Sequence, residues 1–285
     1  MTSPQHFARA ATIRAMLLVL VGSLGMQLSA VIALGLFDTL GVLGTSSTRL
    51  AVAAVFLLII FRPRLRGRTR REWISIVLYG AAMAAMNGFL YLAIERIPLG
   101  VATTIDFLGP CLVALAASRR LREILLALAA MAGVALIAGF GGPFDALGLI
   151  FAAAASVCFG LYTLLAAKIG HSSGGLSAVA LSVAVAAILT LPFSVPAVPL
   201  VRPEQWGLLV LSALLGTALA FTVDTMAGRL TSARVLGVFF AFDPVLGTLL
   251  GVLILGQVLT LPTTLGILLV VAAGAGIVWF AGKRR

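Results

Sequence analysis

Charged residues are scarce in this sequence. Only 10% of its 285 residues are Asp, Glu, Lys or Arg, whereas 61% are hydrophobic. Soluble domains are about 25% charged and about 45–50% apolar. A chain with so little charge cannot cover a water-exposed surface, so the composition excludes a soluble globular domain and indicates an integral membrane protein.

Residues that bind metals are also few. The sequence holds two cysteines, Cys111 and Cys158, and two histidines, His6 and His171, and none of them has metal-ligand spacing. We interpret both cysteines as small apolar residues within spans, and we expect neither a metal nor another cofactor. The nucleotide-binding pattern GxxxxGK[ST] is absent as well, which excludes a P-loop as the source of energy.

Ten apolar stretches are near the length of about 20 residues that a helix needs to cross a bilayer. The first resembles a signal peptide, but it continues to about Gly35 and has a counterpart later in the chain, so we expect a retained helix. The predicted spans are 14–35, 40–61, 73–94, 99–118, 124–140, 147–167, 176–194, 206–227, 235–255 and 263–281. The predicted fold class is therefore all-α, with ten transmembrane helices.

The chain contains two copies of one pattern. Three pairs of landmarks recur at nearly the same spacing of 133, 134 and 135 residues: Trp73 and Trp206, Pro110 and Pro244, and Gly25 and Gly160. We therefore predict two five-helix repeats, residues 1–141 and 142–285. Because five is odd, the second repeat must enter the membrane from the opposite side. Inverted repeats of this kind are typical of secondary transporters.

Lysine and arginine are distributed unevenly among the predicted loops. With the N-terminus in the cytoplasm, 17 of the 20 fall in cytoplasmic segments, Arg96 and Arg202 fall outside, and Arg49 falls within a span. Because cytoplasmic loops accumulate positive charge, we predict a multi-pass inner-membrane protein with both termini in the cytoplasm. The same placement in short loops argues against nucleic acid as the partner of the net charge of +11.

Four ionisable residues lie inside predicted spans, where a charge costs about 2.5–3.5 kcal/mol at the helix centre. They are Arg49, Asp106, Asp224 and Asp243. Such residues are tolerated where they face a cavity or a partner, so each is a candidate for substrate binding or proton coupling. The structural alternatives are an Asp106–Arg49 ion pair, a kink contact for Asp243, and a hydrated interfacial position for Asp224.

Two prolines mark predicted helix kinks. Pro110 follows Asp106 by four residues and lacks the N–H that would bond the carbonyl of Asp106. Pro244 is predicted to free the carbonyl of Phe240 in the same way. Thr103, Asp106 and Pro110 are spaced i, i+3 and i+7, so they share one helix face. The pattern places a carboxylate and a free carbonyl on one loosened turn.

Uncharged polar residues recur at helical spacing within the spans. They are Ser23 and Gln27 in the first, Asn87 and Tyr91 in the third, and Tyr162 in the sixth. Each alone is typical of a helix–helix hydrogen bond, whereas together they indicate a wet central path. Arg49 has two interpretations: a counter-charge for a substrate carboxylate or for Asp106, or a snorkelling or ion-paired structural residue.

Four stretches of the sequence carry a resemblance to a known family. They are RLAVAA from Arg49, RPRLR from Arg62, YLAIERIPLGVATTIDFLGP from Tyr91 to Pro110, and LGVFFAFDPVLGTLLGVLILGQ from Leu236 to Gln257. With them the chain resembles the drug/metabolite transporter superfamily, specifically its EamA-type members, and within these the inner-membrane threonine/homoserine exporter branch. The resemblance covers nearly the whole chain and implies ten helices in two inverted repeats.

The branch typically has glutamate at four positions where this chain differs. Asp106, Asp224 and Asp243 keep the charge on a side chain one methylene shorter, and Gln257 loses it. The resemblance thus implies that transport is retained, while the shorter carboxylates alter the shape of the site.

We therefore expect a secondary transporter, not an enzyme, that exports a small metabolite by alternating access. The resemblance supplies the substrate, an amino acid such as threonine or homoserine. Protons are the expected coupling ion, and Asp106 the group that carries them, because burial disfavours a charged carboxylate. The expected partners are the small-molecule substrate, protons and the lipid bilayer.

Three alternatives stay open. The exported substrate could be a cationic drug or another metabolite. Two intramembrane aspartates could form an intramembrane aspartyl protease, although no GxGD motif precedes any candidate aspartate. The chain could also be a membrane scaffold that transports nothing.

Overall fold

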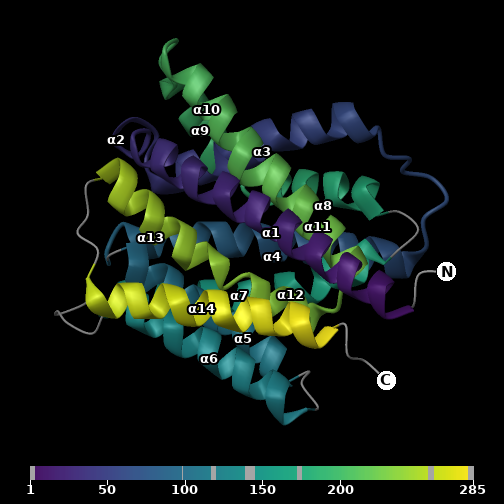
Figure 1. The fold of residues 1–285 in the computed structure, drawn as a ribbon. Coiled ribbons are helices and arrows are strands. Elements are labelled where there is room, and N and C mark those ends of the chain that lie inside the picture. Colours follow the sequence, from purple (N-terminus) through teal and green to yellow (C-terminus); the bar gives the residue numbers. More distant parts are fainter. Residues whose placement is uncertain are drawn as a thin grey trace.

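The computed structural model describes residues 4–97, 99–116, 120–138, 145–171, 175–255 and 260–281, and these residues contain helices and no strand. Figure 1 shows the helices gathered into one bundle. In chain order they are α1 Pro4–Leu34, α2 Phe37–Leu40, α3 Val42–Phe61, α4 Arg70–Ile94, α5 Leu99–Ala116, α6 Leu121–Ala138, α7 Ala146–Gly170, α8 Gly175–Leu189, α9 Leu191–Ala197, η1 Val198–Leu200, α10 Gln205–Ala213, η2 Leu214–Leu219, α11 Ala220–Leu230, α12 Ala233–Phe239, α13 Phe242–Leu255 and α14 Leu261–Ala281.

Five helical segments among the described residues are long and apolar enough to cross a membrane. They are Ala10–Leu34, Val42–Phe61, Arg70–Ile94, Ala146–Gly170 and Gln205–Leu230, and a bent pair, Gly175–Leu189 with Leu191–Leu200, forms a sixth if taken as one span. These segments agree with predicted spans 1, 2, 3, 6, 8 and 7. The chain is thus an all-helical, multi-pass membrane protein.

Three predicted spans are not single regular helices. The seventh bends by 71° between α8 and α9, where Thr190 ends the run of α8 and Pro192 stands in the first turn of α9. Proline fits a first helical turn but cannot continue a regular helix. The ninth divides into α12 and α13, and the π-helical turn η2 interrupts the eighth. The apolar pattern predicts neither the bend in the seventh span nor η2 in the eighth, whereas the break in the ninth lies just before Pro244, where a kink is predicted.

Helices of the first half pack mainly on helices of the second. α4 lies against α7, and α1 lies against α10, η2 and α11. α3 packs on α8, and α6 packs on α14. The contact between the third predicted span and the sixth therefore has a counterpart, with the halves exchanged, in the contact between the eighth and the first.

The beginning of α1 and the end of α14 lie on the same side of the bundle, at the right in Figure 1, together with the arginine-rich loop from Arg62 to Thr69. An even number of membrane crossings returns the chain to its starting side. The arrangement is consistent with the even number of spans predicted from the apolar pattern.

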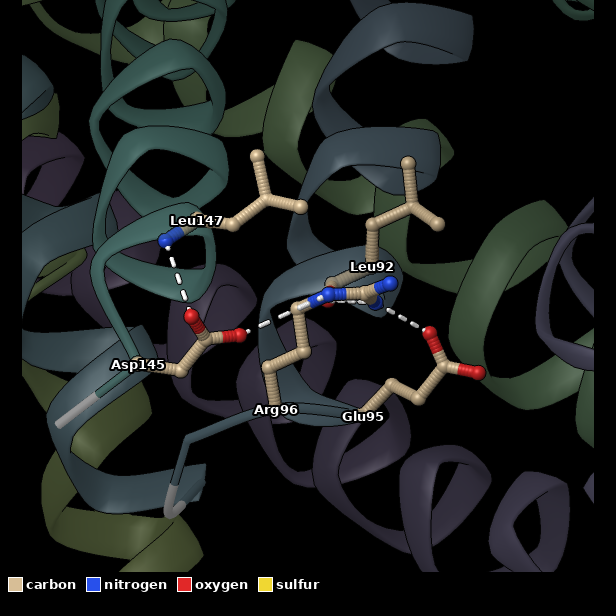
Figure 2. Close-up of polar contacts among 5 residues, drawn as sticks. All are labelled: Leu92, Glu95, Arg96, Asp145 and Leu147. Atoms are coloured by element: carbon tan, nitrogen blue, oxygen red, sulfur yellow. Dashed lines mark hydrogen bonds and ion pairs between the residues drawn. The ribbon is translucent and has the colours of Figure 1, made fainter.

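Polar contacts fasten the end of α4 to the start of α7 (Figure 2). Asp145 caps α7, because its Oδ1 accepts a hydrogen bond of 3.1 Å from the backbone N–H of Leu147. Its Oδ2 lies 3.6 Å from Nε of Arg96, which also forms an ion pair with Glu95. The Arg96 guanidinium lies 5.5 Å from the ring centroid of Phe151. One arginine thus joins the two helices at this end.

Glycines permit the closest helix approaches. Gly109 in α5 faces Gly160 in α7, and a Cβ at Gly109 would overlap the carbonyl oxygen of Ser156. Small residues at such crossings let helix backbones approach closely in membranes. Because backbone atoms cannot move aside as a side chain can, this crossing requires glycine.

Gly109→Ala is expected to lower stability by about 1–3 kcal/mol, the usual cost of overpacking. The matched control is Gly88→Ala in α4, where a Cβ would meet only Leu43 at 3.9 Å. This control is expected to keep or raise stability, because alanine is the better helix former. Thermal melting of both purified variants tests the prediction, and equal melting temperatures would contradict it.

Candidate functional site

A central cavity lies between the two halves. Its volume, counted as the space open to the centres of water molecules, is about 70 Å³, which is enough for several waters. The lining residues come from α1, α4, α5, α7, α11 and α13. The polar ones are Ser23, Gln27, Asn87, Tyr91, Thr103, Asp106, Tyr162, Asp224 and Asp243. The structure thus brings together nearly all of the candidate site residues predicted from the sequence.

Three carboxylates face this cavity, and no lysine or arginine among the described residues lines it. The side chains of Asp106 and Asp224 are buried, with 5% and 7% exposed, and Asp243 is half-buried. Asp243 is close enough to the other two for charge repulsion. The cavity therefore favours positively charged groups.

The three carboxylates differ in their hydrogen bonds. Asp224 accepts a bond of 2.7 Å from the hydroxyl of Tyr162, and Ser23 bonds to Asp243. In the described part of the chain, Oδ1 of Asp106 is buried without a hydrogen-bond partner. An unsatisfied buried acceptor is costly, so Asp106 is the carboxylate best prepared to receive a proton or a ligand donor.

An aromatic layer borders the cavity around Tyr162. Its ring stacks on that of Tyr79, with 5.2 Å between centroids, and lies 5.5 to 6.0 Å from the rings of Phe159, Phe221 and Phe240. The hydroxyl of Tyr79 lies 3.0 Å from Oγ1 of Thr225. These contacts connect α4 of the first half with α7, α11 and the turn after α12 of the second.

The uncharged polar residues predicted for the path do line the cavity. Nδ2 of Asn87 donates a hydrogen bond of 3.0 Å to the carbonyl of Met83. This bond uses one N–H of the amide and does not involve its oxygen. A Cβ at Gly247 would lie 2.9 Å from Oε1 of Gln27, so α13 passes close to this amide. Asn87 and Gln27 thus offer amide groups to the cavity from two different helices.

Arg49 neither reaches the membrane surface nor pairs with Asp106, which were two of its sequence-based interpretations. It is 1% exposed, which excludes snorkelling, and it is not among the cavity-lining residues. No ion pair joins it to Asp106 or to another carboxylate within the described ranges. Instead it donates to Oγ of Ser29, and its guanidinium lies 5.4 Å from the ring centroid of Tyr91. The structural alternative of an Asp106–Arg49 ion pair is therefore wrong.

The two prolines also differ in their effects. Pro110 lies inside α5, as predicted. The prediction that Pro244 frees the carbonyl of Phe240 is wrong, because this carbonyl accepts a hydrogen bond of 3.0 Å from the N–H of Asp243. The helix begins anew at Phe242, so Pro244 stands in a first turn, where a missing N–H costs little. Gln257, the fourth position at which this chain differs from the exporter branch it resembles, lies outside the described residues.

Sequence reasoning missed several buried polar partners. Tyr79 belongs to the aromatic layer, and its hydroxyl bonds to that of Thr225. The hydroxyls of Ser29 and Ser212 lie 2.8 Å apart beside Arg49. Gly216 leaves the room that Ser29 and Arg49 occupy. Polar side chains within apolar spans indicate an interior position, but only contacts between distant segments reveal which partners these residues meet. Among the described residues, no group of three His, Cys, Asp or Glu side chains could hold a metal.

Comparison with known proteins extends these observations. The model of the EamA-like transporter family matches residues 13–141 and 146–279. The threonine/homoserine exporter RhtA of Salmonella typhimurium (strain LT2) is 29% identical over 267 residues, which cover 91% of this chain and 90% of that protein. RhtA of Escherichia coli (strain K12) is 28% identical over 268 residues, covering 91% and 89%. A solved crystal structure shares the fold, with a TM-score of 0.72, 20% identity, and coverage of 96% and 99%.

Proposed function

The chain belongs to the EamA-like transporter family, and from that membership we propose that it exports a small amino acid in exchange for protons. The family and the relatives make it a membrane exporter in the inner membrane, and a transporter rather than an intramembrane protease or another enzyme. The substrate, the coupling ion and the roles of individual residues are our proposal.

The observation that carries the proposal is the cavity, whose described lining holds three carboxylates and no cation. An ammonium group or a proton would relieve the repulsion among Asp106, Asp224 and Asp243. A substrate carboxylate would need hydrogen-bond donors, which the hydroxyl of Tyr91 and the amides of Gln27 and Asn87 can supply. A zwitterionic amino acid therefore fits the chemistry of the lining.

The names of the relatives narrow the proposed substrate. The exporters RhtA of two bacteria are threonine/homoserine exporters, and both amino acids carry a hydroxyl as well as the ammonium and carboxylate groups. The cavity holds the hydroxyls of Ser23 and Thr103. We propose that threonine and homoserine are substrates.

Exchange with protons follows from competition for one site. A proton on Asp106 and an ammonium group beside it both neutralise the same charge, so binding of one disfavours the other. We propose that the two halves rock about this site as inverted repeats. The support for two related halves is the exchange of contacts, in which α4 meets α7 as α10, η2 and α11 meet α1, and an odd number of spans in each half makes the repeats inverted.

The proposal is tested by transport into and out of proteoliposomes. Liposomes loaded with radiolabelled threonine or homoserine should release it faster when the opposite side is acidified, and the release should be accompanied by proton uptake. Liposomes without protein and liposomes loaded with an uncharged sugar are the controls. Release that is unaffected by the proton gradient would contradict proton coupling.

A second candidate function is export of cationic compounds. The absence of lysine and arginine from the described part of the cavity lining favours it, because a cation without a carboxylate would need no balancing donors. Competition in the same liposomes separates the candidates. An aromatic cation that blocks threonine release and is itself transported would favour this second function.

Both termini are proposed to lie in the cytoplasm. Fusions of alkaline phosphatase, which is active only outside, and of green fluorescent protein, which is fluorescent only inside, to residue 285 test this. We expect fluorescence without phosphatase activity, because basic residues hold loops on the cytoplasmic side. Phosphatase activity at the C-terminus would contradict the proposed orientation.

A further inference from the structure

A second cavity, of about 230 Å³, lies apart from the central one. It is formed where α4 begins, where α7 ends and where α8 packs on both. Three cationic side chains line it, from Arg68, Arg71 and Lys168, with Ile76 and Ile169 among its apolar members. We call it the basic pocket. Because Arg68 and Thr69 belong to the arginine-rich loop, the pocket lies at the end of the bundle that carries this loop.

The cations of the basic pocket are not neutralised by the protein. Across the described residues, no carboxylate lies within ion-pair distance of any of the three. The carboxylate in the pocket belongs to Glu72, and its Oε2 accepts the N–H of Thr69 at 2.8 Å in the capping box of α4. The pocket thus carries an excess of positive charge that a phosphate would neutralise.

An apolar surface continues from the basic pocket along α4. Ile74 and Leu78 follow Arg71 at i+3 and i+7, so all three share one helix face. Both are large and exposed, at 49% and 46%. A free phosphate would leave this surface bare, whereas a phospholipid would cover it with an acyl chain. Basic pockets between membrane helices on the cytoplasmic side are suited to anionic headgroups.

We propose that the basic pocket binds the phosphodiester headgroup of an anionic phospholipid. Arg71 and Lys168, from different helices, approach the phosphate from two sides, and Arg68 completes the ring of cations. The acyl chain lies along Ile74 and Leu78. Because α4 and α7 belong to different halves and also line the central cavity, the lipid would contact two helices that move during transport.

The test uses the purified full chain in a neutral detergent, titrated with dioleoyl phosphatidylglycerol or dioleoyl phosphatidylcholine, with native mass spectrometry as the readout. Each basic residue near a membrane surface strengthens binding of an anionic lipid about fivefold. The variant Arg68→Gln/Arg71→Gln/Lys168→Gln should therefore bind phosphatidylglycerol about a hundredfold more weakly. The smaller variant Arg71→Gln/Lys168→Gln, expected to lose about twenty-fivefold, replaces it if the first does not fold.

The matched control is Arg62→Gln/Arg64→Gln/Arg66→Gln. It removes the same number of positive charges, all from the loop that precedes α4, but none of these side chains lines the basic pocket. It should retain phosphatidylglycerol affinity to within about fivefold. Equal losses in both triple variants, or no loss in either, would overturn the proposal. So would inorganic phosphate that binds the wild-type chain as tightly as phosphatidylglycerol, because the site would then recognise a soluble anion.

Discussion

Tyr162→Phe is expected to lower stability by about 1–3 kcal/mol and to slow transport, because it removes one oxygen atom from a buried network. The hydroxyl of Tyr162 donates to Oδ2 of Asp224 at 2.7 Å, and both side chains are buried. Leaving a buried acceptor unsatisfied costs about that free energy. The ring would remain stacked on Tyr79, so the packing of the layer should change little.

The network containing Tyr162 has a position suited to a barrier. In α4 the cavity-lining residues Met86, Asn87 and Tyr91 lie in the second half of the helix, whereas Tyr79 lies in the first. The layer formed by Tyr79 and Tyr162 thus separates the cavity from the end where α4 begins. We infer that weakening it would let the cavity leak to that side and reduce the coupling between proton and substrate.

The control for this prediction is Tyr91→Phe. Tyr91 lines the same cavity, and its ring would remain beside Arg49. Thermal melting should show a smaller loss for Tyr91→Phe than for Tyr162→Phe. A double-mutant cycle with Asp224→Asn isolates the interaction: the effects of Tyr162→Phe and Asp224→Asn should be less than additive. Additive effects would show that the hydrogen bond contributes nothing.

The sequence predicted the class of fold and the polar part of the cavity lining for a simple physical reason. A charged or polar side chain within an apolar span is costly unless it faces a partner or water. Asp106, Asp224 and Asp243 could therefore be assigned to an interior path from the amino-acid pattern alone. The cavity that they share, with Asn87 and Tyr162, agrees with that assignment.

The sequence could not predict which polar groups meet. Arg49 and Asp106 have opposite charges in spans of similar depth, and pairing them was reasonable, yet Arg49 lies against Ser29 and Tyr91 instead. The rotation of each helix about its own axis decides which side chains meet. The apolar pattern does not determine this rotation, because the lipid and the protein core are equally apolar. The break between α12 and α13 falls at Phe240 and Ala241, just before Pro244, where the sequence predicts a kink. Nothing in the apolar pattern predicts the π-helical turn η2 in the eighth span.

Asp106→Asn is expected to reduce proton-driven export to the level of empty liposomes while the protein stays folded. Asparagine keeps the shape of the side chain but cannot carry a proton on and off. An ion pair with Arg49 does not complicate the result, because the two side chains are not paired and the substitution leaves no buried cation uncompensated. Stability should therefore be unchanged or higher in the variant, since an uncharged amide costs less to bury than a carboxylate.

Three measurements on the Asp106 variants separate a coupling role from a structural one. The melting temperature of Asp106→Asn reports folding, and the pH dependence of threonine release reports coupling. Asp106→Glu, which keeps a titratable group, should retain proton-driven export. Asp38→Asn changes a carboxylate of α2 away from the cavity and should transport normally. A stable Asp106→Asn protein with normal pH-dependent export would exclude the role proposed for Asp106, because no other property of the side chain could then account for coupling at this position.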